Sequence, residues 1–378
     1  MNQHARVAVI GCGRVAGHHC RYIRESEGVE LTAVCDLIEE KASAYGSEFN
    51  VPYYTNYRDM LNAHPEINTV AVVTPSGMHY EHSMEILERF KKNIVVEKPT
   101  FMRPSQVINA YKAAKSLGLK IFPVFQNRNN VAVQRVRNAL DNGELGKIRI
   151  IAVRYRWCRP QRYYELSPWR GTFSHDGGAL TNQGIHHVDL LRYLGGEITK
   201  VNTTMATLGV NIEVEDTIVS TMVCESGALG VLEVTTAARP IDYEASVSLV
   251  CENGLAQIGG IAANELQIFT PDPDACLKYS EDFSGNVYGH GHGAIYRQIG
   301  ANLGHNEPYL VDETDCLNSI RLLHAFYRSD EKKDWVDVVS DEESSRLGRA
   351  NDELSNLFRT PLKQEDQEWI KMSNKIRQ

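Results

Sequence analysis

The sequence lacks any run of about 18 apolar residues, which a membrane-spanning helix would need, so we expect no membrane partner. It also lacks a C-x-x-C pair among its eight cysteines, which favours free thiols over disulfides and indicates no metal site. Met1 leads directly into a strand-like segment, without the charged and then apolar segment of a secretion signal. Together these absences predict a cytoplasmic location.

The chain also lacks an excess of basic residues. Its 40 lysines and arginines stand against 48 acidic residues, and this net charge of −8 argues against a nucleic-acid partner. The hydrophobic share of 42% and the charged share of 23% are typical of a soluble globular protein. Because 378 residues are too many for one ordinary core, we expect two domains.

The first 125 residues alternate between strand-like and helix-like segments. The expected strands are Arg6–Ile10, Glu30–Cys35, Thr69–Val73, Asn93–Val96 and Lys120–Val124, and the expected helices include Val15–Arg24, His79–Arg89 and Ser105–Leu117. This alternation predicts a parallel sheet covered by helices on both faces. We therefore expect residues 1–125 to form an α/β domain.

The turn after the first expected strand fits the pattern G-x-G-x-x-G/A. Gly11 permits a tight turn, Gly13 lets the backbone approach a pyrophosphate, and Ala16 is small enough for close packing of helix on strand. The start of the next helix offers free N–H groups to phosphate. The turn predicts a Rossmann domain that binds a dinucleotide; the alternative is a glycine-rich turn that binds no cofactor.

Asp36 ends the second expected strand, 20 residues after the turn. A carboxylate there accepts hydrogen bonds from both ribose hydroxyls and repels a 2′-phosphate, which favours NAD over NADP. Arg14 and Lys41 lie close in sequence and weaken that preference.

Two further polar segments follow the expected strands Thr69–Val73 and Asn93–Val96. Thr74-Pro75, with His79, follows one strand, and Glu97-Lys98-Pro99 follows the other. Ligands of open α/β sheets bind outside the carboxyl ends of the strands, so both segments should face the cofactor cleft. The alternative for the Glu-Lys pair is a solvated strand end. The cofactor contacts that we expect are Gly11, Gly13, Arg14, Val15, Asp36, Thr74, Pro75, His79, Glu97, Lys98 and Gln126.

The pattern changes after residue 126. A helix over Arg128–Asn142 should bridge the domains, and strands are expected over Ile148–Trp157, Val201–Thr207, Thr217–Cys224, Leu229–Thr236 and Ala245–Cys251. The turns between the later strands predict an antiparallel meander. We expect residues 126–335 to form an α+β substrate domain, and residues 336–378 to form a charged helical tail.

The segment from Asn182 to Asp189 carries groups suited to proton transfer. Oxidation of a secondary alcohol removes a hydroxyl proton, and His186 titrates near neutral pH. If this segment opens a helix, Asn182, His186 and Asp189 share one face. Asp189 then either orients His186 or caps local structure, whereas His187 points elsewhere and is expected to be structural.

Arginines and aromatic residues are interleaved between residues 154 and 170. Guanidinium groups match carboxylate and phosphate oxygens, and aromatic rings stack on sugars or bases. We expect an anion site here that includes Arg156 and Arg170. The alternative is a solvated basic loop or a subunit contact.

Taken together, these motifs resemble the glucose–fructose oxidoreductase / inositol dehydrogenase / MocA family from about Arg6 to about Tyr327. The motifs are the glycine turn, Thr74-Pro75 with His79, Glu97-Lys98-Pro99, and Gly177-Gly178-Ala179-Leu180 to Asp189. The resemblance implies a large open, mostly antiparallel sheet in the second domain, and hydride transfer between nicotinamide and a sugar or cyclitol carbon. It implies that Lys98 and His186 act at that carbon, either one as the base, and that a His290, His292 and Tyr296 segment lies near the substrate. By analogy it also implies a homo-dimer or homo-tetramer.

One residue departs from part of the family. Members similar to inositol dehydrogenase carry Asp where this chain has Asn182, and an amide orients a hydroxyl but takes up no proton. The segments Trp169–Thr172, Gly177–His186 and Thr235–Pro240 resemble a branch that oxidises C3 of UDP-N-acetylglucosaminuronate for surface polysaccharides. We therefore expect an NAD-dependent sugar dehydrogenase whose substrate is a nucleotide sugar bound by Lys98, Arg156, Arg170, Asn182, His186 and Tyr296. The alternatives are a dehydrogenase of a free sugar or cyclitol such as myo-inositol, and a non-catalytic nicotinamide-sensing regulator.

Overall fold

A computed structural model describes residues 4–283, 287–340 and 342–369. The first domain contains a six-stranded parallel sheet in the order β3-β2-β1-β4-β5-β6. Its strands are β1 (Ala5–Ile10), β2 (Val29–Cys35), β3 (Tyr53–Tyr54), β4 (Thr69–Val72), β5 (Asn93–Val96) and β6 (Ile121–Pro123). Strands β1, β4 and β5 are almost wholly buried, as expected for a parallel sheet covered on both faces. The prediction of a Rossmann domain is confirmed.

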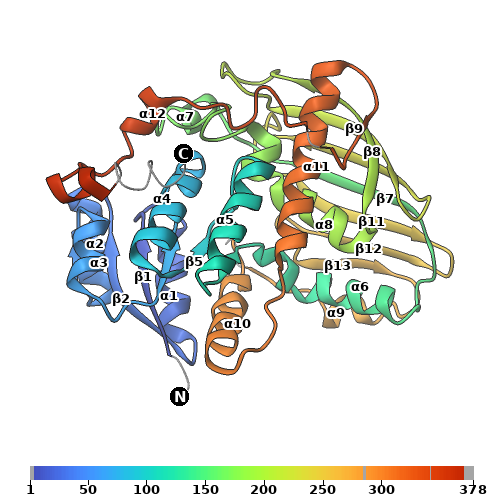
Figure 1. Cartoon of the computed structure of the whole chain (residues 1–378). Helices are drawn as coiled ribbons and strands as arrows, with labels where there is room; N and C mark the ends of the chain where they lie inside the picture. The colour runs from blue at the N-terminus through green and yellow to red at the C-terminus, as the bar shows by residue number, and fades with distance from the viewer. Residues whose placement is uncertain (1–3, 284–286, 341, 370–378) are drawn as a thin grey trace.

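Helices flank this sheet (Figure 1). They are α1 (Ala16–Glu25), α2 (Glu39–Phe49), α3 (Tyr57–Ala63), α4 (His79–Glu85) and α5 (Pro104–Ser116). One more helix, α10 (Gly291–His305), comes from far along the chain and packs on α1 and on β1. Its Ile295 and Ile299 belong to the same buried cluster as Val7 and Val9 of β1. The first domain is therefore completed by a helix that the sequence analysis assigned to the second.

The second domain contains an eight-stranded sheet in the order β13-β12-β11-β7-β10-β9-β8-β14. Its strands are β7 (Ile148–Arg156), β8 (Ile198–Ala206), β9 (Thr217–Cys224), β10 (Leu229–Thr235), β11 (Glu244–Cys251), β12 (Leu255–Gly259), β13 (Glu265–Phe269) and β14 (Val336–Asp337). Neighbouring strands are antiparallel except β7 and β10, which run parallel. The mostly antiparallel sheet is confirmed, although β12, β13 and β14 were not predicted.

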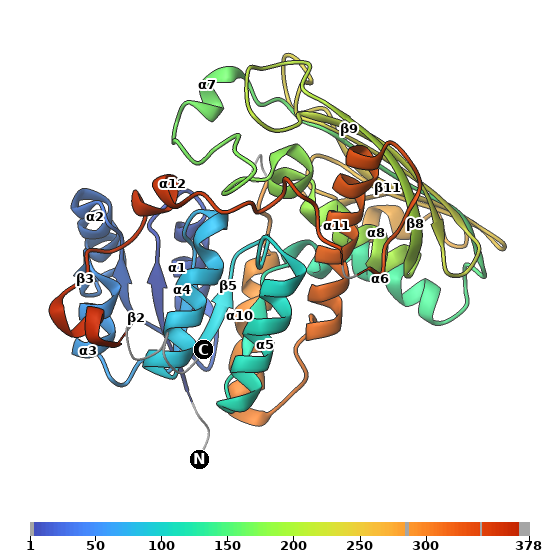
Figure 2. The same cartoon turned by 45° about the horizontal axis from the view of Figure 1, so that its top comes forward.

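Three helices cover one face of this sheet: α6 (Val131–Asp141), α8 (Ile185–Gly195) and α11 (Glu313–Lys332) (Figure 2). The other face carries exposed apolar side chains, because alternate residues of each strand point away from the helices. Ile150 on β7, Val219 on β9 and Val231 on β10 are more than 40% exposed. The sheet itself is open, with β13 and β14 at its two edges, as the resemblance implied.

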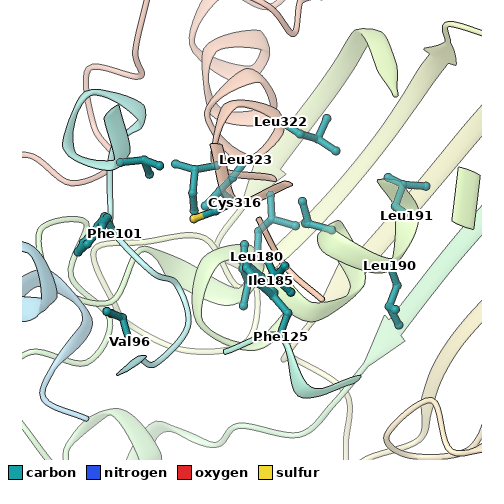
Figure 3. Packing of buried hydrophobic residues seen from close by; sticks show 14 of the residues in the cluster. Val96, Phe101, Phe125, Leu180, Ile185, Leu190, Leu191, Cys316, Leu322 and Leu323 are labelled. Atoms are coloured by element: carbon teal, nitrogen blue, oxygen red, sulfur yellow. The ribbon is translucent and has the colours of Figure 1, made fainter. Parts of the chain in front are cut away.

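The two domains share one continuous core (Figure 3). Val96, Phe101 and Phe125 of the first domain and Leu180 and Ile185 of the second belong to the same buried cluster. Full burial of each such side chain contributes about 1.5–3 kcal/mol. The end of β5 and the start of α8 are therefore held against a shared apolar layer, which fixes the polar residues next to them.

The chain returns to the first domain after α11. Strand β14 pairs with β8, and residues 342–369, called here the C-terminal strap, then run across the top of the first domain (Figure 2). The strap contains the short helix α12 (Asp352–Asn356) and a second helical segment over residues 364–369, joined by turns and irregular chain. The expectation of a helical tail is therefore met only in part. No helix in the described part of the chain is long and apolar enough to span a membrane.

Candidate active site

A cleft with a cavity volume of about 420 Å³ lies between the two domains. One wall is formed by the segments that follow β1, β2, β4 and β5, where ligands of open α/β sheets bind. The other wall comes from the second domain, between Tyr155 and His187, and the strap contributes to the rim. This volume is in the range of small-molecule sites.

The glycine turn has the shape that a pyrophosphate requires. Gly11 has a φ of +96°, and a Cβ at this position would lie 2.4 Å from the carbonyl oxygen of Val73, so only glycine fits. A Cβ on Gly13 would meet nothing within 4 Å, which leaves its outer side open to a phosphate. No side chain caps the start of α1 after Val15. In the first turn the N–H groups of Ala16 and His18 already donate to the carbonyl oxygens of Gly13 (3.2 Å) and Val15 (3.0 Å), so the helix start favours an anion mainly through its positive dipole end.

Asp36 stands in the cleft at the end of β2. Its Oδ2 accepts a hydrogen bond from the backbone N–H of Cys12 (2.8 Å), and its Oδ1 accepts one from Ile38 (2.9 Å). The glycine turn and the carboxylate are therefore locked together, with room left for a ribose. Arg14 and Lys41 also line the cleft. The residues present fit a dinucleotide with a free 2′-hydroxyl.

His79 holds two loops of the cleft together. Its Nδ1 lies 2.9 Å from the carbonyl oxygen of Pro99, and its Nε2 lies 2.9 Å from that of Thr74. Burial lowers the pKa of His79, and a neutral imidazole donates to only one carbonyl at a time. His79 therefore positions the Thr74-Pro75 segment beside the cleft and has little capacity left for a ligand.

Glu97 is the centre of a buried hydrogen-bonded group. Its Oε1 accepts from Nε2 of His19 (2.9 Å) and Nε2 of His292 (3.3 Å), and its Oε2 accepts from the backbone N–H of Lys98 (3.0 Å). Burial alone would raise the pKa of Glu97, but the two histidine bonds hold it well below its usual value. The ligand atoms of Glu97, His19 and His292 also lie within 4.8 Å of one another. Sequence spacing did not reveal this group, because its members come from three distant segments.

Tyr296 was predicted to bind substrate, and the structure places it elsewhere. Its side chain is fully buried, and its hydroxyl lies 2.7 Å from Nδ1 of His19. It stands behind the histidines that hold Glu97, so it supports the cleft wall from inside the core.

Lys98 crosses from the end of β5 to the second domain. Its Nζ donates to the backbone oxygen of Asn182 (2.7 Å) and to its Oδ1 (3.3 Å). Burial lowers the pKa of Lys98. An ammonium group has three donors, so one remains for an oxygen atom of a ligand in the cleft.

His186 lines the same cleft at the start of α8. Its Nε2 lies 3.2 Å from Nε2 of Gln126, whereas its Nδ1 has no partner among the described residues. Burial, and then the charge of Lys98, lowers the pKa of His186 well below its usual value. The imidazole is therefore neutral at neutral pH and can accept a proton. The structure thus brings Lys98, Gln126 and His186 together.

Asn182 lies in a π-helical turn, Ala179–Gln183, just before α8. Its amide nitrogen donates to Asp176, whose other carboxylate oxygen accepts from the backbone N–H of Gly171 (2.7 Å). Burial raises the pKa of Asp176 to about 6. Asp176 thereby turns the amide oxygen of Asn182 toward Lys98. The sequence analysis missed Asp176, since nothing in the local pattern shows where its side chain points.

Of the two chosen arginines, only Arg170 reaches the cleft. Its guanidinium lies 4.3 Å from the ring centre of Tyr163 and 4.8 Å from that of Trp169, and it donates to the Tyr163 hydroxyl. Its Nε is buried without a hydrogen-bond partner among the described residues. Arg159, which also lines the cleft, lies 4.6 Å from the ring of Trp157 and pairs with Asp242 (3.0 Å).

The prediction for Arg156 is corrected by the structure. Strand β7 sends Tyr155 toward the cleft, so Arg156 points to the opposite face of the sheet. There Arg156 forms ion pairs with Glu233 (2.6 Å) and Glu244 (3.1 Å). It lies outside the cleft, and its charge is already neutralised.

Two neighbours of His186 on α8 differ in their surroundings. Asp189 accepts two hydrogen bonds from Arg128, each 2.7 Å long, and one from Ser319. It therefore anchors α8 rather than orienting His186. The ring of His187 packs 4.9 Å from that of Tyr155, and both residues line the cleft, so His187 does not point away from it as expected.

Comparison with known protein families gives two matches. A profile described as "Oxidoreductase family, NAD-binding Rossmann fold" matches residues 5–125, and one described as "GFO/IDH/MocA C-terminal domain" matches residues 133–257. The two matches follow one another along the chain and include Lys98 and His186, whereas Gln126, Tyr288 and the strap residues of the cleft lie outside them.

Solved structures and curated proteins provide individual relatives. The WlbA dehydrogenase from Bordetella pertussis, solved in complex with NADH and UDP-GlcNAcA, is 32% identical with a TM-score of 0.84; the match covers 90% of this chain and 99% of that one. The D-glucoside 3-dehydrogenase of Escherichia coli is 32% identical over 198 residues, which are 50% of this chain and 54% of that protein. The scyllo-inositol 2-dehydrogenase of Bacillus subtilis is 28% identical over 205 residues, 53% of this chain and 57% of that protein.

Proposed function

This chain belongs to the GFO/IDH/MocA family of NAD-dependent oxidoreductases, and we propose that it oxidises C3 of a UDP-linked N-acetylglucosaminuronate. The observation that carries the proposal is the meeting of Lys98 and His186 in the cleft that also contains the glycine turn and Asp36. The expected cofactor site and two side chains that can donate or accept a proton thus lie in the same cleft. That arrangement suits removal of a hydride and a proton from the same alcohol.

The two groups take different parts in the reaction. The Nζ of Lys98 already donates to two oxygen atoms, which favours its charged form, so its remaining donor holds the reacting hydroxyl oxygen. His186 is neutral and accepts the hydroxyl proton as the C–O bond becomes a carbonyl. Bound NAD supplies the hydride acceptor. Asn182, held by Asp176, keeps Lys98 in place.

The second wall of the cleft suits an anionic sugar nucleotide. Arg170 offers a buried, unpartnered Nε, and the rings of Tyr163 and Trp169 provide surfaces for a sugar or a base. The Bordetella relative, crystallised with UDP-GlcNAcA, supports a substrate of this class. A pathway that makes surface polysaccharides would use such an oxidation.

A spectrophotometric assay tests this proposal. The enzyme is mixed with NAD and, separately, with UDP-N-acetylglucosaminuronate, UDP-N-acetylglucosamine, UDP-glucuronate, glucose and myo-inositol, and reduced nicotinamide is followed by absorbance. We expect turnover with the first compound and at least tenfold lower kcat/KM with the others. Faster turnover of glucose or myo-inositol would overturn the substrate assignment. Tight NAD binding with no turnover of any compound would indicate a nicotinamide sensor instead.

We also propose an oligomeric state and a cytoplasmic location for this chain. Exposed apolar residues of the open sheet face, including Ile150, Val219 and Val231, suit contact with a second copy of the chain, so we expect a homo-dimer or homo-tetramer. The eight free cysteines are compatible with a reducing cytoplasm. Light scattering of the purified protein measures the assembly, and a monomeric mass at micromolar concentration would contradict it.

A further inference from the structure

The C-terminal strap, residues 342–369, spans the mouth of the cleft. At its root, Arg346 pairs with Asp330 on α11 (2.7 Å), and the backbone N–H of Gly348 donates to the carbonyl oxygen of Phe173 (2.9 Å). At its far end, Asp366 is 3% exposed and pairs with Arg89 of the first domain (2.7 Å). The strap is therefore tied to both domains (Figure 2), and the residues between its two anchors include some that line the cleft.

The middle of the strap forms part of the cleft itself. Leu357, Phe358 and Thr360 line it. Leu357 is 60% exposed, although it is a large apolar side chain at the rim of a binding site. A ligand in the cleft that touched Leu357 would remove this apolar surface from water, which is favourable.

The contacts of the strap locate it at one end of the cleft. Arg359 pairs with Glu81 on α4 (2.8 Å), and Arg58 on α3 donates to the carbonyl oxygen of Thr360 (3.2 Å). Helices α3 and α4 follow β3 and β4, which lie on the Asp36 side of β5 in the sheet order. Asp36 marks the end of the site that holds the adenosine ribose, whereas Lys98, after β5, marks the reacting end.

We propose that the strap is part of the cofactor site, where it closes over the adenosine end of bound NAD and limits the rate at which the nucleotide leaves. This inference rests on the proposed NAD-dependent function. Arg359 and Glu81 are both partly exposed, and exposed ion pairs of this kind are individually weak. Lifting the middle of the strap while its two anchors remain in place would break this weak pair and the buried hydrogen bond from Arg58 to Thr360.

Dissociation of NADH is the direct test. NADH fluorescence is followed by stopped flow as excess NAD displaces it from the wild type and from the double variant Leu357→Ala/Phe358→Ala. We expect the variant to release NADH at least tenfold faster, with a smaller change in the association rate. Leu277→Ala, at an exposed leucine of α9 (Ala275–Lys278), serves as the matched control and should behave like the wild type.

A second measurement needs no substitution in the strap. Trypsin cleaves after Arg359 and Lys363, and bound ligand should slow that cleavage if it holds the strap down. We expect protection by NAD and by ADP-ribose but not by nicotinamide mononucleotide, which lacks the adenosine end. Equal cleavage rates with and without NAD, at saturating concentrations, would overturn the inference, as would NADH release from the double variant within twofold of the wild type.

The two proposals fail in different ways. If the wild type binds neither NAD nor NADH, the proposed function itself is wrong. If the wild type binds NADH and oxidises the sugar nucleotide while the strap variant and the protease assay show no effect, only the role of the strap is wrong.

Discussion

The two walls of the cleft obtain their functional residues in different ways. In the first domain, Asp36 and Lys98 each follow directly from the end of a parallel strand, and the strand fixes where they lie. In the second domain, Arg170, Asp176 and Asn182 lie in a long loop and a π-helical turn, where hydrogen bonds within the same irregular segment decide their direction. Under the proposed function, the first wall provides the cofactor site and Lys98, whereas the second provides His186 and the groups that select the substrate.

The largest expected effect is on the first wall. Lys98→Met removes the donor to the reacting oxygen, and we expect kcat to fall roughly 10²–10³-fold, as for loss of one such donor. The dissociation constant of NAD should change by less than threefold. The matched control is Lys92→Met at the other end of β5, where Nζ donates only to the carbonyl oxygen of Pro65. An unchanged kcat in the Lys98→Met variant would show that Lys98 does not take part in the chemical step.

The second prediction contrasts two arginines that the sequence analysis treated alike. Arg170→Ala should raise KM for the nucleotide sugar roughly 10–100-fold, because hydrogen bonds to charged groups contribute about 1.5–3 kcal/mol. Arg156→Ala should change KM by less than twofold, because its guanidinium is paired with Glu233 on the far face of the sheet. Steady-state kinetics of both variants measure the two KM values. Equal changes in KM would show that Arg170 is not the arginine that binds the substrate.

The sequence predicts the residues of the first wall better than those of the second. The glycine turn, Asp36 and Lys98 could be placed because a parallel strand has one direction and one edge at which ligands bind. Arg156 could not be placed, because the two faces of β7 are equivalent until α8 packs on one of them. The packing of α10 on the first domain and the burial of Tyr296 depend on contacts between residues almost 300 positions apart, which no local pattern carries.

A smaller effect is expected from Asp176. Its pKa of about 6 means that the carboxylate holds the Asn182 amide above this pH and becomes protonated below it. We expect kcat/KM of the wild type to decline as the pH falls through 6. In Asp176→Asn this decline should be absent, and kcat/KM at pH 8 should be about threefold lower. Persistence of the decline near pH 6 in the variant would assign it to another group.

The smallest expected effect is on stability, through Glu215 beneath the π-helical turn. Its carboxyl group accepts from the Tyr327 hydroxyl (2.6 Å) and the Leu180 backbone N–H (3.2 Å), and burial raises its pKa to about 8. The folded state therefore binds this proton more tightly than the unfolded state, so stability falls as the pH rises from about 4.5 to about 8. Glu215→Gln should lose this dependence and melt roughly 5 °C higher than the wild type at pH 9. Parallel melting curves of the two proteins at pH 6 and pH 9 would contradict the prediction.

The most direct test of the account is a crystal structure of the enzyme with NADH and UDP-N-acetylglucosaminuronate. We predict that Nζ of Lys98 and a ring nitrogen of His186 both lie about 2.6–3.2 Å from the hydroxyl oxygen on C3. A complex in which that oxygen contacts neither side chain, or contacts them from outside the cleft, would contradict it.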